Sequence, residues 1–407
     1  MRPVLLITSN NTLIPVMPEL AETFDLCVIG QHGVAVDMGI EGAFPLGKYG
    51  NPDLNEVAIN VSYQLAAKLL EPKTSASLSD EVERWANTPK DQLSASRVQG
   101  WWPAMVGEHV RQHAMVINML KAAMEERRVV GCLVHEDVTP DMRATVLYCK
   151  ERGVPTFHVP HANTYYTDSE WDIHTESISD YICASGNYTR DFYTRWGYLP
   201  DKIRLTGVPQ LDSWYGDNPP SRNESRRVLG LDDRDFVILY ATSWAQLTAI
   251  RGEYEVEHTR NLTLMADTAR AMKATLVIKM HPGEAQGGEA NYHKFLQETG
   301  TRGCVTRHYN EYALRAGDVL VSHGPSNICL QSAIIGLPSV YIPTEGHEFP
   351  FGVVRYNGDM IEAIRQAQGT PKEEWDRFAH TMNCAHPEGG AAKRVAEFVK
   401  ETIGDLN

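Results

Sequence analysis

The chain has 407 residues, which is enough to bury more than one hydrophobic core, and this length favours two or three domains. Apolar residues make up 43% of the sequence and charged residues 22%, values that are ordinary for a globular protein and exclude a disordered or fibrous chain. The 38 basic and 52 acidic residues give a net charge of −14, which repels nucleic acid and anionic lipid overall without excluding a locally basic cleft.

The cysteines and the apolar runs bear on the compartment. The seven cysteines are scattered and include no C-x-x-C pair, which fits a reducing environment. Residues 1–7 are apolar over too short a distance for a signal peptide, and no apolar run is long enough to span a membrane. We therefore expect a cytoplasmic protein with no membrane span.

Strand and helix patterns alternate along the first half of the chain. Apolar runs at 3–8 and 26–29 predict buried strands, and helical spacing follows at 56–70. Residues 73–100 are polar and serine-rich, so we expect an insertion there, followed by a long helix at 101–127. A mostly parallel sheet is then predicted by strands at 129–134, 156–159, 181–184 and 203–206 and helices at 140–152 and 187–196.

A stretch rich in Gly, Pro, Asp and Asn at 207–220, GVPQLDSWYGDNPP, predicts a domain boundary. Beyond it the pattern restarts, with strands at 237–240, 275–280, 305–307, 318–321 and 339–342 and helices at 259–273, 328–335, 359–367, 373–382 and 390–403. The expected fold class is α/β, with two Rossmann-like domains. Their expected bounds are 1–207 (including the insertion), a linker at 208–222, a second domain at 223–385, and a terminal helix within 386–407 that can cross back to the first domain.

The stretch 318–342, DVLVSHGPSNICLQSAIIGLPSVYI, predicts a strand, a loop of small residues, a helix and another strand. Ser326 or Asn327 is the expected N-cap of the helix. Unpaired backbone N–H groups and the helix dipole favour an anion at such a terminus. The loop residues Ser322, His323 and Gly324 are therefore candidates for binding a phosphate. An ordinary βαβ turn with a capping serine is an equally good interpretation.

Lys279 and His281 occur in the sequence KMHPGE, at the end of a predicted strand. Strand alternation would place the two side chains on the same side, where both could donate to the oxygens of a diphosphate. Thr242 and Ser243 end the first strand of the second half, and their hydroxyls and amides could hold a phosphate. A turn at the His–Pro pair and a hydrophilic loop at Thr242 are the alternatives.

The first half offers candidate bases at two strand ends. Glu136 and Asp137 follow the strand at 129–134, and a carboxylate in a closed cleft would have a raised pKa and could take a proton from a hydroxyl. The alternative is that Asp137 or Thr139 caps the next helix. His158 and His161 lack a third ligand at zinc-like spacing, so no metal site is expected. The alternative to a catalytic role is that one is a satisfied histidine inside the sheet and the other is an exposed histidine.

Three motifs in this order resemble the GT-B superfamily: TGVPQLD at 206–212, KMHPGE at 279–284 and SHGPSNICLQSAIIGLP at 322–338. The chain looks similar to bacterial UDP-N-acetylglucosamine 2-epimerases, CDP-glycerol glycerophosphotransferases and capsule transferases with a His–Pro motif. The order of the predicted strands and helices resembles this superfamily over most of the chain. The matching sequence motifs are confined to residues 156–163 and 203–342. The two nucleotide-binding signatures G-x-x-x-x-G-K-[ST] and G-x-G-x-x-G are absent.

The resemblance implies two Rossmann-like domains with parallel sheets facing across a cleft, the second binding the donor nucleotide and the cleft holding the acceptor. The resemblance implies that His281 contacts the donor phosphate or nucleotide, and that Ser326 and Asn327 bind the phosphate at the N-terminus of the helix. Where the family has a Glu that holds the ribose hydroxyls, this chain has Gln331, whose amide can still form hydrogen bonds. The acidic residues typical of the epimerases are incomplete in SHGPSNICLQS and HVPHANTYY.

The expected function is therefore a metal-independent glycosyltransferase that moves a sugar from a nucleotide-sugar to a hydroxyl. The co-substrate would be of the UDP or CMP/CDP type, with no other cofactor. Glu136, Asp137 and His161 are the candidate bases. The alternatives are a CDP-glycerol-type phospho-alcohol transferase, a UDP-sugar 2-epimerase, an enzyme that glycosylates a modified DNA base, and a binding protein without turnover.

Overall fold

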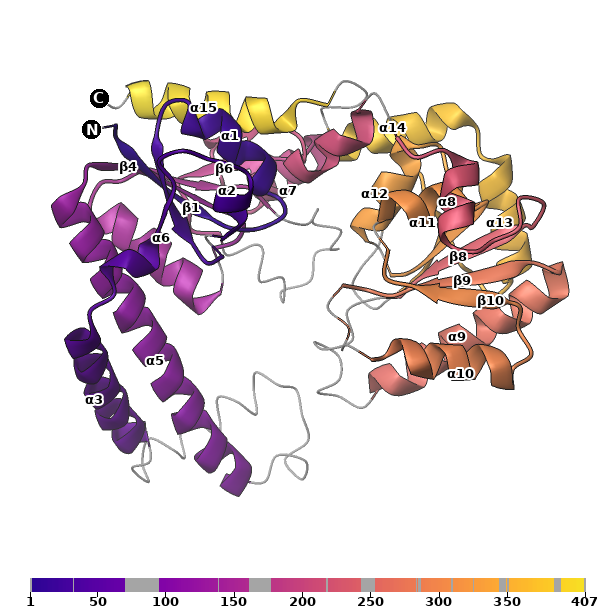
Figure 1. The fold of residues 1–407 in the computed structure, drawn as a ribbon, viewed down its shortest axis with the longest axis horizontal. Helices are drawn as coiled ribbons and strands as arrows, with labels where there is room; N and C mark the ends of the chain where they lie inside the picture. Colours follow the sequence, from indigo (N-terminus) through magenta and orange to yellow (C-terminus); the bar gives the residue numbers. More distant parts are fainter. Residues whose placement is uncertain are drawn as a thin grey trace. The chain divides into compact units, whose positions relative to one another are not determined.

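The structure is a computed structural model that describes residues 2–31, 33–69, 95–137, 139–160, 177–216, 219–242, 253–282, 284, 287–308, 310–324, 326–343, 349, 351–383 and 389–405 (Figure 1). It forms two compact units. The first contains the described residues of Met1–Val159, Glu176–Ile182 and Ala396–Asn407, and the second those of Pro160–Thr175 and Cys183–Val395. The domain bounds expected from the sequence stay a prediction.

Seven strands form the first sheet, in the order β3-β2-β1-β4-β5-β6-β7. The register pairs of β1 with β2 and β4, of β2 with β3, of β4 with β5 and of β5 with β6 are all parallel. The strands are β1 (Val4–Thr8), β2 (Asp25–Ile29), β3 (Phe44–Pro45), β4 (Val129–Val134), β5 (Thr156–His158), β6 (Tyr181–Ala184) and β7 (Ile203–Leu205).

Both faces of the first sheet are covered, which explains why β1 reads as an unbroken apolar run. Val4 and Leu6 of β1 share a core with residues of α5 (Ala95–Glu126) and α6 (Pro140–Glu151). On the other face, the position of a Cβ on Gly131 would lie 2.8 Å from side-chain atoms of Leu5 and Ile403, the latter in α15 (Ala391–Asp405). The other described α-helices that precede β7 in the chain are α1 (Met17–Ala21), α2 (Gly33–Asp37), α3 (Pro52–Leu69) and α7 (Asn187–Arg195), the last within the second unit.

The second sheet has the order β10-β9-β8-β11-β12-β13, and all its register pairs are parallel. Its strands are β8 (Val237–Ala241), β9 (Thr275–Lys279), β10 (Gly303–Thr306), β11 (Val319–His323), β12 (Ser339–Ile342) and β13 (Val354–Arg355). The prediction of two Rossmann-like parallel sheets is confirmed.

Successive residues of β8 enter different cores, as the pleat of a strand requires. Val237 and Leu239 pack with α11 (Asn310–Ala316), α12 (Asn327–Ile334) and α14 (Lys372–Met382). Ile238 and Tyr240 pack on the opposite face with α9 (Glu253–Met272), α10 (Glu289–Glu298) and α13 (Met360–Gly369). Figure 1 shows this sandwich, with α9 and α10 on one side of the sheet and α11 and α12 on the other.

Several details differ from the sequence predictions. The expected linker at 208–222 contains a 3-10 helix, Pro209–Tyr215, whose Leu211 and Trp214 are buried in the second unit. The long helix α5 begins at Ala95, inside the expected insertion, and residues 70–94 lie outside the described residues. Helices α10 and α11 and the two-residue strands β3 and β13 were not predicted, because they are short and carry little periodic signal.

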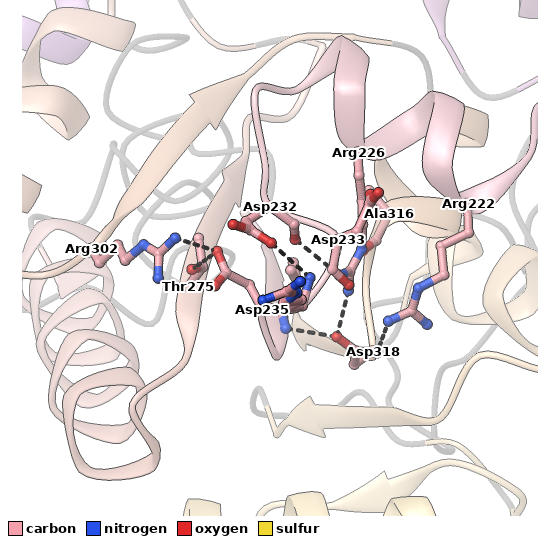
Figure 2. A network of polar contacts seen from close by, with 11 residues as sticks. Arg222, Arg226, Asp232, Asp233, Asp235, Thr275, Arg302, Ala316 and Asp318 are labelled. Atoms are coloured by element: carbon pink, nitrogen blue, oxygen red, sulfur yellow. Dashed lines mark hydrogen bonds and ion pairs between the residues drawn. The ribbon is translucent and has the colours of Figure 1, made fainter.

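Arg226 of α8 (Arg222–Val228) fixes the amino-terminal edge of the second sheet (Figure 2). Its guanidinium is fully buried and donates to the carbonyl of Ala316 and, at 2.7 Å, to Oδ2 of Asp318. The same Asp318 oxygen accepts from the backbone N–H of Val237 at 2.7 Å, so α8, β8 and β11 meet at one carboxylate. Two more donor bonds from Arg226 reach the carbonyls of Asp232 and Asp233.

Among the helices that the structure describes, none combines the length and apolar character needed to cross a bilayer.

Candidate functional site

The carboxyl edge of the second sheet has a topological switch point between β8 and β11. From β8 the chain winds outward to β9 and β10, then returns to β11 on the other side. Ligands of open α/β sheets bind in the crevice outside the carboxyl ends of the strands at such a point. Lys279 ends β9, Thr242 follows β8 and His323 ends β11. Ala241 is paired with both Lys279 and Ser322, so these three strand ends are level.

The KMHPGE turn is closed by Glu284. Its carboxylate accepts from the backbone N–H of His281 at 2.8 Å and from the hydroxyl of Thr242. The His281 N–H also lies 2.9 Å from the Thr242 hydroxyl oxygen, and the Thr242 N–H donates to the carbonyl of Lys279 at 3.1 Å. Strand β9 ends at Lys279, so His281 lies in this turn and strand alternation does not extend to it. The turn that carries His281 is thus tied to the end of β8.

Two residues from the helices on one face complete this arrangement. The hydroxyl of Tyr292 on α10 donates to Oε2 of Glu284 at 2.6 Å. It also lies 3.0 Å from Nε2 of His258 on α9, which can donate to the Tyr oxygen when the proton is on Nε2. Sequence reasoning quoted Glu284 only as part of the motif and did not select Tyr292 or His258, since no local pattern connects them.

His323 is almost completely buried at the end of β11, with its side chain 2% exposed. Its Nε2 atom lies 3.5 Å from Oε1 of Glu257 on α9, and the same carboxylate oxygen lies 3.7 Å from Arg260. The structure therefore pairs one predicted donor-binding residue with a carboxylate that the sequence did not single out.

Burial lowers the pKa of four basic groups at this edge, Lys279, His281, His258 and His323. Desolvation is the main cause for Lys279, His281 and His258, and in each case the carboxylate of Glu284 partly offsets it. Desolvation also lowers the pKa of His323, with Glu257 acting in the opposite direction. An anion bound here would favour the charged forms, so the site is suited to bind a phosphate together with protons.

The loop before α12 has a shape that depends on Gly324. Its φ of 77° is in the left-handed region, its N–H donates to the carbonyl of Ile342 at 2.8 Å, and its own carbonyl accepts from the Ser322 hydroxyl at 2.8 Å. Ser322 and Gly324 therefore hold the loop in place. Ser326 is the N-cap of α12, and its side chain makes no capping hydrogen bond, so its hydroxyl is not used by the helix.

The structure describes some of the remaining predicted site residues and leaves others outside the described residues. Asn327 is the first residue of α12, and Gln331, one turn later, accepts from the side-chain amide of Asn310 at 2.7 Å. Lys279 Nζ donates to the carbonyl of Met280 at 2.8 Å. Ser243 and the predicted base His161 lie outside the described residues.

The first sheet has its own switch point, between β1 and β4. His135 directly follows β4, and its Nδ1 atom lies 2.9 Å from the hydroxyl oxygen of Thr8, the last residue of β1. Its Nε2 atom lies 4.0 Å from Oε1 of Glu136, which also accepts from the hydroxyl of Thr139 at 2.8 Å. Sequence reasoning selected Glu136 but not His135.

Asp137 is fully buried and holds a loop. Its Oδ2 atom accepts from the hydroxyl of Ser177 at 2.7 Å and from the backbone N–H groups of Ile178 and Ser179 at 2.9 and 2.8 Å. Burial alone raises the pKa of this carboxyl, but nearby His158 and the hydrogen bonds from Ser179 and Ser177 outweigh burial and lower it. The expectation of a raised pKa was wrong for Asp137, because the loop donates to its ionised form.

His158 at the end of β5 is the satisfied histidine inside the sheet that the sequence offered as one interpretation. Its Nδ1 atom lies 3.1 Å from the Ser177 hydroxyl and 3.9 Å from Oδ1 of Asp137. Among the described residues, no group of three or more His, Cys, Asp and Glu side chains is placed to hold a metal ion.

One known protein family matches part of this chain in sequence. Residues 148–322 match the family described as CDP-Glycerol:Poly(glycerophosphate) glycerophosphotransferase, a match that includes β9, the KMHPGE turn, β10 and all of β11 except His323. No curated protein matches the chain in sequence.

The solved structures similar to the chain span its whole length. The UDP-GlcNAc 2-epimerase of Neisseria meningitidis, solved with UDP-GlcNAc, has a TM-score of 0.58 and 16% identity, over 98% of this chain and 100% of that one. The epimerase of Methanocaldococcus jannaschii, solved with UDP-GlcNAc and UDP, gives 0.58 and 13% over the same shares. An Anabaena protein solved with UDP-glucose gives 0.53 and 9%, over 99% of each chain. The fold is GT-B-like. At these identities the likeness shows the fold alone.

Proposed function

We propose that this protein is a transferase that uses a nucleotide-activated donor and binds it at the carboxyl edge of the second sheet. The observation that carries the proposal is that Lys279, His323 and the turn with His281 lie at one switch point, beside a helix whose N-cap Ser326 makes no capping bond. The family match over residues 148–322 supports a transferase; it includes Lys279 and His281 and ends one residue before His323.

The proposed chemistry follows from these groups. When a nucleotide leaves, negative charge develops on its phosphate oxygens. Lys279 and His281 can donate to those oxygens, and the N-terminus of α12 adds backbone N–H groups and the positive end of its dipole. This set can neutralise the leaving group without a metal, so we propose metal-independent transfer. Gln331 remains the proposed contact to the ribose hydroxyls, with Asn310 orienting its amide.

An acceptor hydroxyl also needs a base, which we assign to the first unit. Glu136 and His161 remain candidates from the sequence. Asp137 is a poor candidate, because the donors on its carboxylate lower its pKa and hold it in a buried loop.

The transferred group is proposed to be a sugar, as in a UDP-sugar-dependent glycosyltransferase. The specific observation for a second candidate is the family match, which favours glycerophosphate transfer from CDP-glycerol. Epimerisation of UDP-N-acetylglucosamine is less favoured, because the acidic residues typical of epimerases are incomplete in this chain.

One experiment separates these reactions. The wild-type protein is incubated with UDP-GlcNAc, UDP-glucose or CDP-glycerol, with water as the default acceptor, and released nucleotide and epimerised sugar are measured. We expect nucleotide release from one donor class, with Lys279→Ala and His281→Ala at least about 100-fold slower and still folded. His293→Gln, an exposed histidine on α10, is the control. Wild-type rates in both alanine variants would refute the donor site, and epimerised sugar without nucleotide release would refute transfer.

A further inference from the structure

We propose that His135 is the group that takes the proton from the acceptor hydroxyl, with Thr8 and Glu136 as its positioning residues. This inference rests on the proposed transferase function and names a residue that neither the sequence motifs nor the comparisons selected.

His135 lies at the switch point of the first sheet. From β1 the chain continues outward to β2 and β3, and it then returns to β4 on the other side of β1. His135 directly follows β4, and Thr8 ends β1. Both residues therefore lie where open α/β sheets bind their ligands. Thr8 is 2% exposed, whereas the side chain of His135 is 18% exposed, so the imidazole is fixed at its base and remains partly accessible.

The hydrogen bonds of Thr8 fix the orientation of the ring. The Thr8 hydroxyl oxygen accepts from the backbone N–H of His135 at 3.2 Å and lies 2.9 Å from Nδ1. Both the main chain and the ring of His135 are therefore held by one hydroxyl. When Nδ1 carries the proton and donates to Thr8, Nε2 has the lone pair that a base needs.

The carboxylate of Glu136 is placed to stabilise the protonated ring. Its Oε1 atom lies 4.0 Å from Nε2 of His135, a distance too long for a direct hydrogen bond but close enough for charge attraction. The hydroxyl of Thr139 donates to the same oxygen at 2.8 Å and holds the carboxylate beside the ring. A negative charge at this point favours the imidazolium that forms when the base takes a proton.

The proposed step balances as follows. The acceptor O–H bond breaks and its proton goes to Nε2 of His135. The acceptor oxygen forms a bond to the anomeric carbon of a sugar donor, or to the phosphorus next to the alcohol in a CDP-alcohol donor. The bond from that atom to the leaving oxygen breaks, and its electron pair leaves with the nucleotide. Imidazole is suited to this task because its ordinary pKa lies near neutral pH.

The test compares full-length variants in nucleotide release from the donor that the wild-type protein uses, with water as acceptor, and in UDP or CDP affinity by calorimetry. We expect His135→Gln to lower kcat by about 10²- to 10⁴-fold, the usual contribution of a general base, while nucleotide affinity stays unchanged. Thr8→Val should lower kcat by about tenfold and Thr8→Ser should restore it, because only the hydroxyl holds the ring. Glu136→Gln should lower kcat with little change in KM, and His293→Gln should change neither.

Two outcomes would overturn the proposal in distinguishable ways. A wild-type protein that turns over donor, with His135→Gln and Thr8→Val at wild-type rates, would overturn the role of His135 and leave the proposed function intact. A wild-type protein that binds nucleotide but releases none from any donor would overturn the proposed function and this inference with it. Should His135→Gln fail to fold, the contrast of Thr8→Val with Thr8→Ser decides, since equal rates in those two variants contradict the proposal.

Discussion

Two carboxylates, Glu284 and Asp137, show how single residues shape the strand ends of the two sheets. Each follows a strand at the carboxyl edge, and each accepts several hydrogen bonds from the residues around it. Charge-assisted hydrogen bonds of this kind are stronger than neutral ones, so each carboxylate can hold a loop in one conformation. A carboxylate at a strand end therefore indicates a structural role as readily as a catalytic one, and the donors around it decide between them.

The lowered pKa values of His281, His258 and His323 predict a pH dependence at the residue scale. In the unfolded chain these imidazoles take up protons near their ordinary pKa of 6.5, whereas the folded protein takes them up only at lower pH. Stability should therefore fall as the pH drops below 6.5 toward the folded-state values. Bound UDP or CDP should reverse this by favouring the charged forms.

Calorimetry of nucleotide binding in buffers of different ionisation enthalpy checks this prediction. Slightly below pH 6.5 the wild-type complex should take up protons, and His281→Ala should take up fewer. A binding enthalpy that is the same in every buffer would contradict it.

At the scale of elements, two helix N-caps offer a matched comparison. Ser221 caps α8 and accepts from the N–H of Glu224 at 3.2 Å, whereas Ser326 caps α12 without a side-chain bond. Ser221→Ala should cost about 1 kcal/mol of stability, and Ser326→Ala clearly less. Ser326→Ala should instead weaken UDP or CDP binding by about tenfold, through loss of a hydrogen bond to a charged phosphate. Thermal unfolding and calorimetry measure the two effects, and the reverse pattern would show that Ser326 serves the helix.

The attachment of α8 to the second sheet offers another comparison. Arg226 is fully buried and Arg222 is half exposed, yet both pair with Asp318 (Figure 2). Arg226→Ala should lower the free energy of unfolding by about 3–5 kcal/mol, because it removes a buried donor from the carboxylate of Asp318 and from several carbonyls. Arg222→Ala should change it by less than about 1 kcal/mol, as expected for an exposed pair. Denaturant unfolding of both variants measures the two changes. Equal losses in the free energy of unfolding would show that the burial of Arg226 does not set its contribution to stability.

At the scale of the whole molecule, α15 takes part in both units. Its first N–H groups, from Ala391 and Ala392, donate to the carboxylate of Asp212 at 2.9 and 2.8 Å within the second unit. Further along the helix, Phe398 packs edge-on against Phe157 and Tyr181 of the first unit, with ring centroids 5.8 Å apart in each case. The last part of the chain therefore completes the core of its first part.

Removing that contact should loosen the first unit specifically. Phe398→Ala should destabilise it by about 3–5 kcal/mol, through lost burial and the cavity left behind. Hydrogen exchange should then be faster in β5 and β6 and unchanged in β8 and β9. Gly404→Ala, on the same helix with open space around its Cβ position, is the control and should stabilise by about 0.5–1 kcal/mol. Faster exchange in both sheets would contradict this division.

Most of the sheet strands could be predicted because each is a local apolar run between turn residues. The predicted runs at 3–8, 129–134 and 237–240 correspond to β1, β4 and β8. The burial of Leu211 and Trp214 in the expected linker could not be predicted, since a Gly- and Pro-rich composition indicates turns and does not say what packs on them.

The sequence by itself determined the α/β class, the two parallel sheets and the position of Lys279 at a strand end with His281 just after it, because periodicity and turn residues act over a few neighbouring positions. His323, expected in a loop, instead ends β11. Only the tertiary structure decided which side chains meet there. Tyr292 of α10 reaches Glu284 and contacts His258 of α9, and Thr8 meets His135 although 127 positions separate them. Hydrogen bonds between residues so distant in the chain depend on how the strands are ordered in the sheet, and that order leaves no local mark on the sequence.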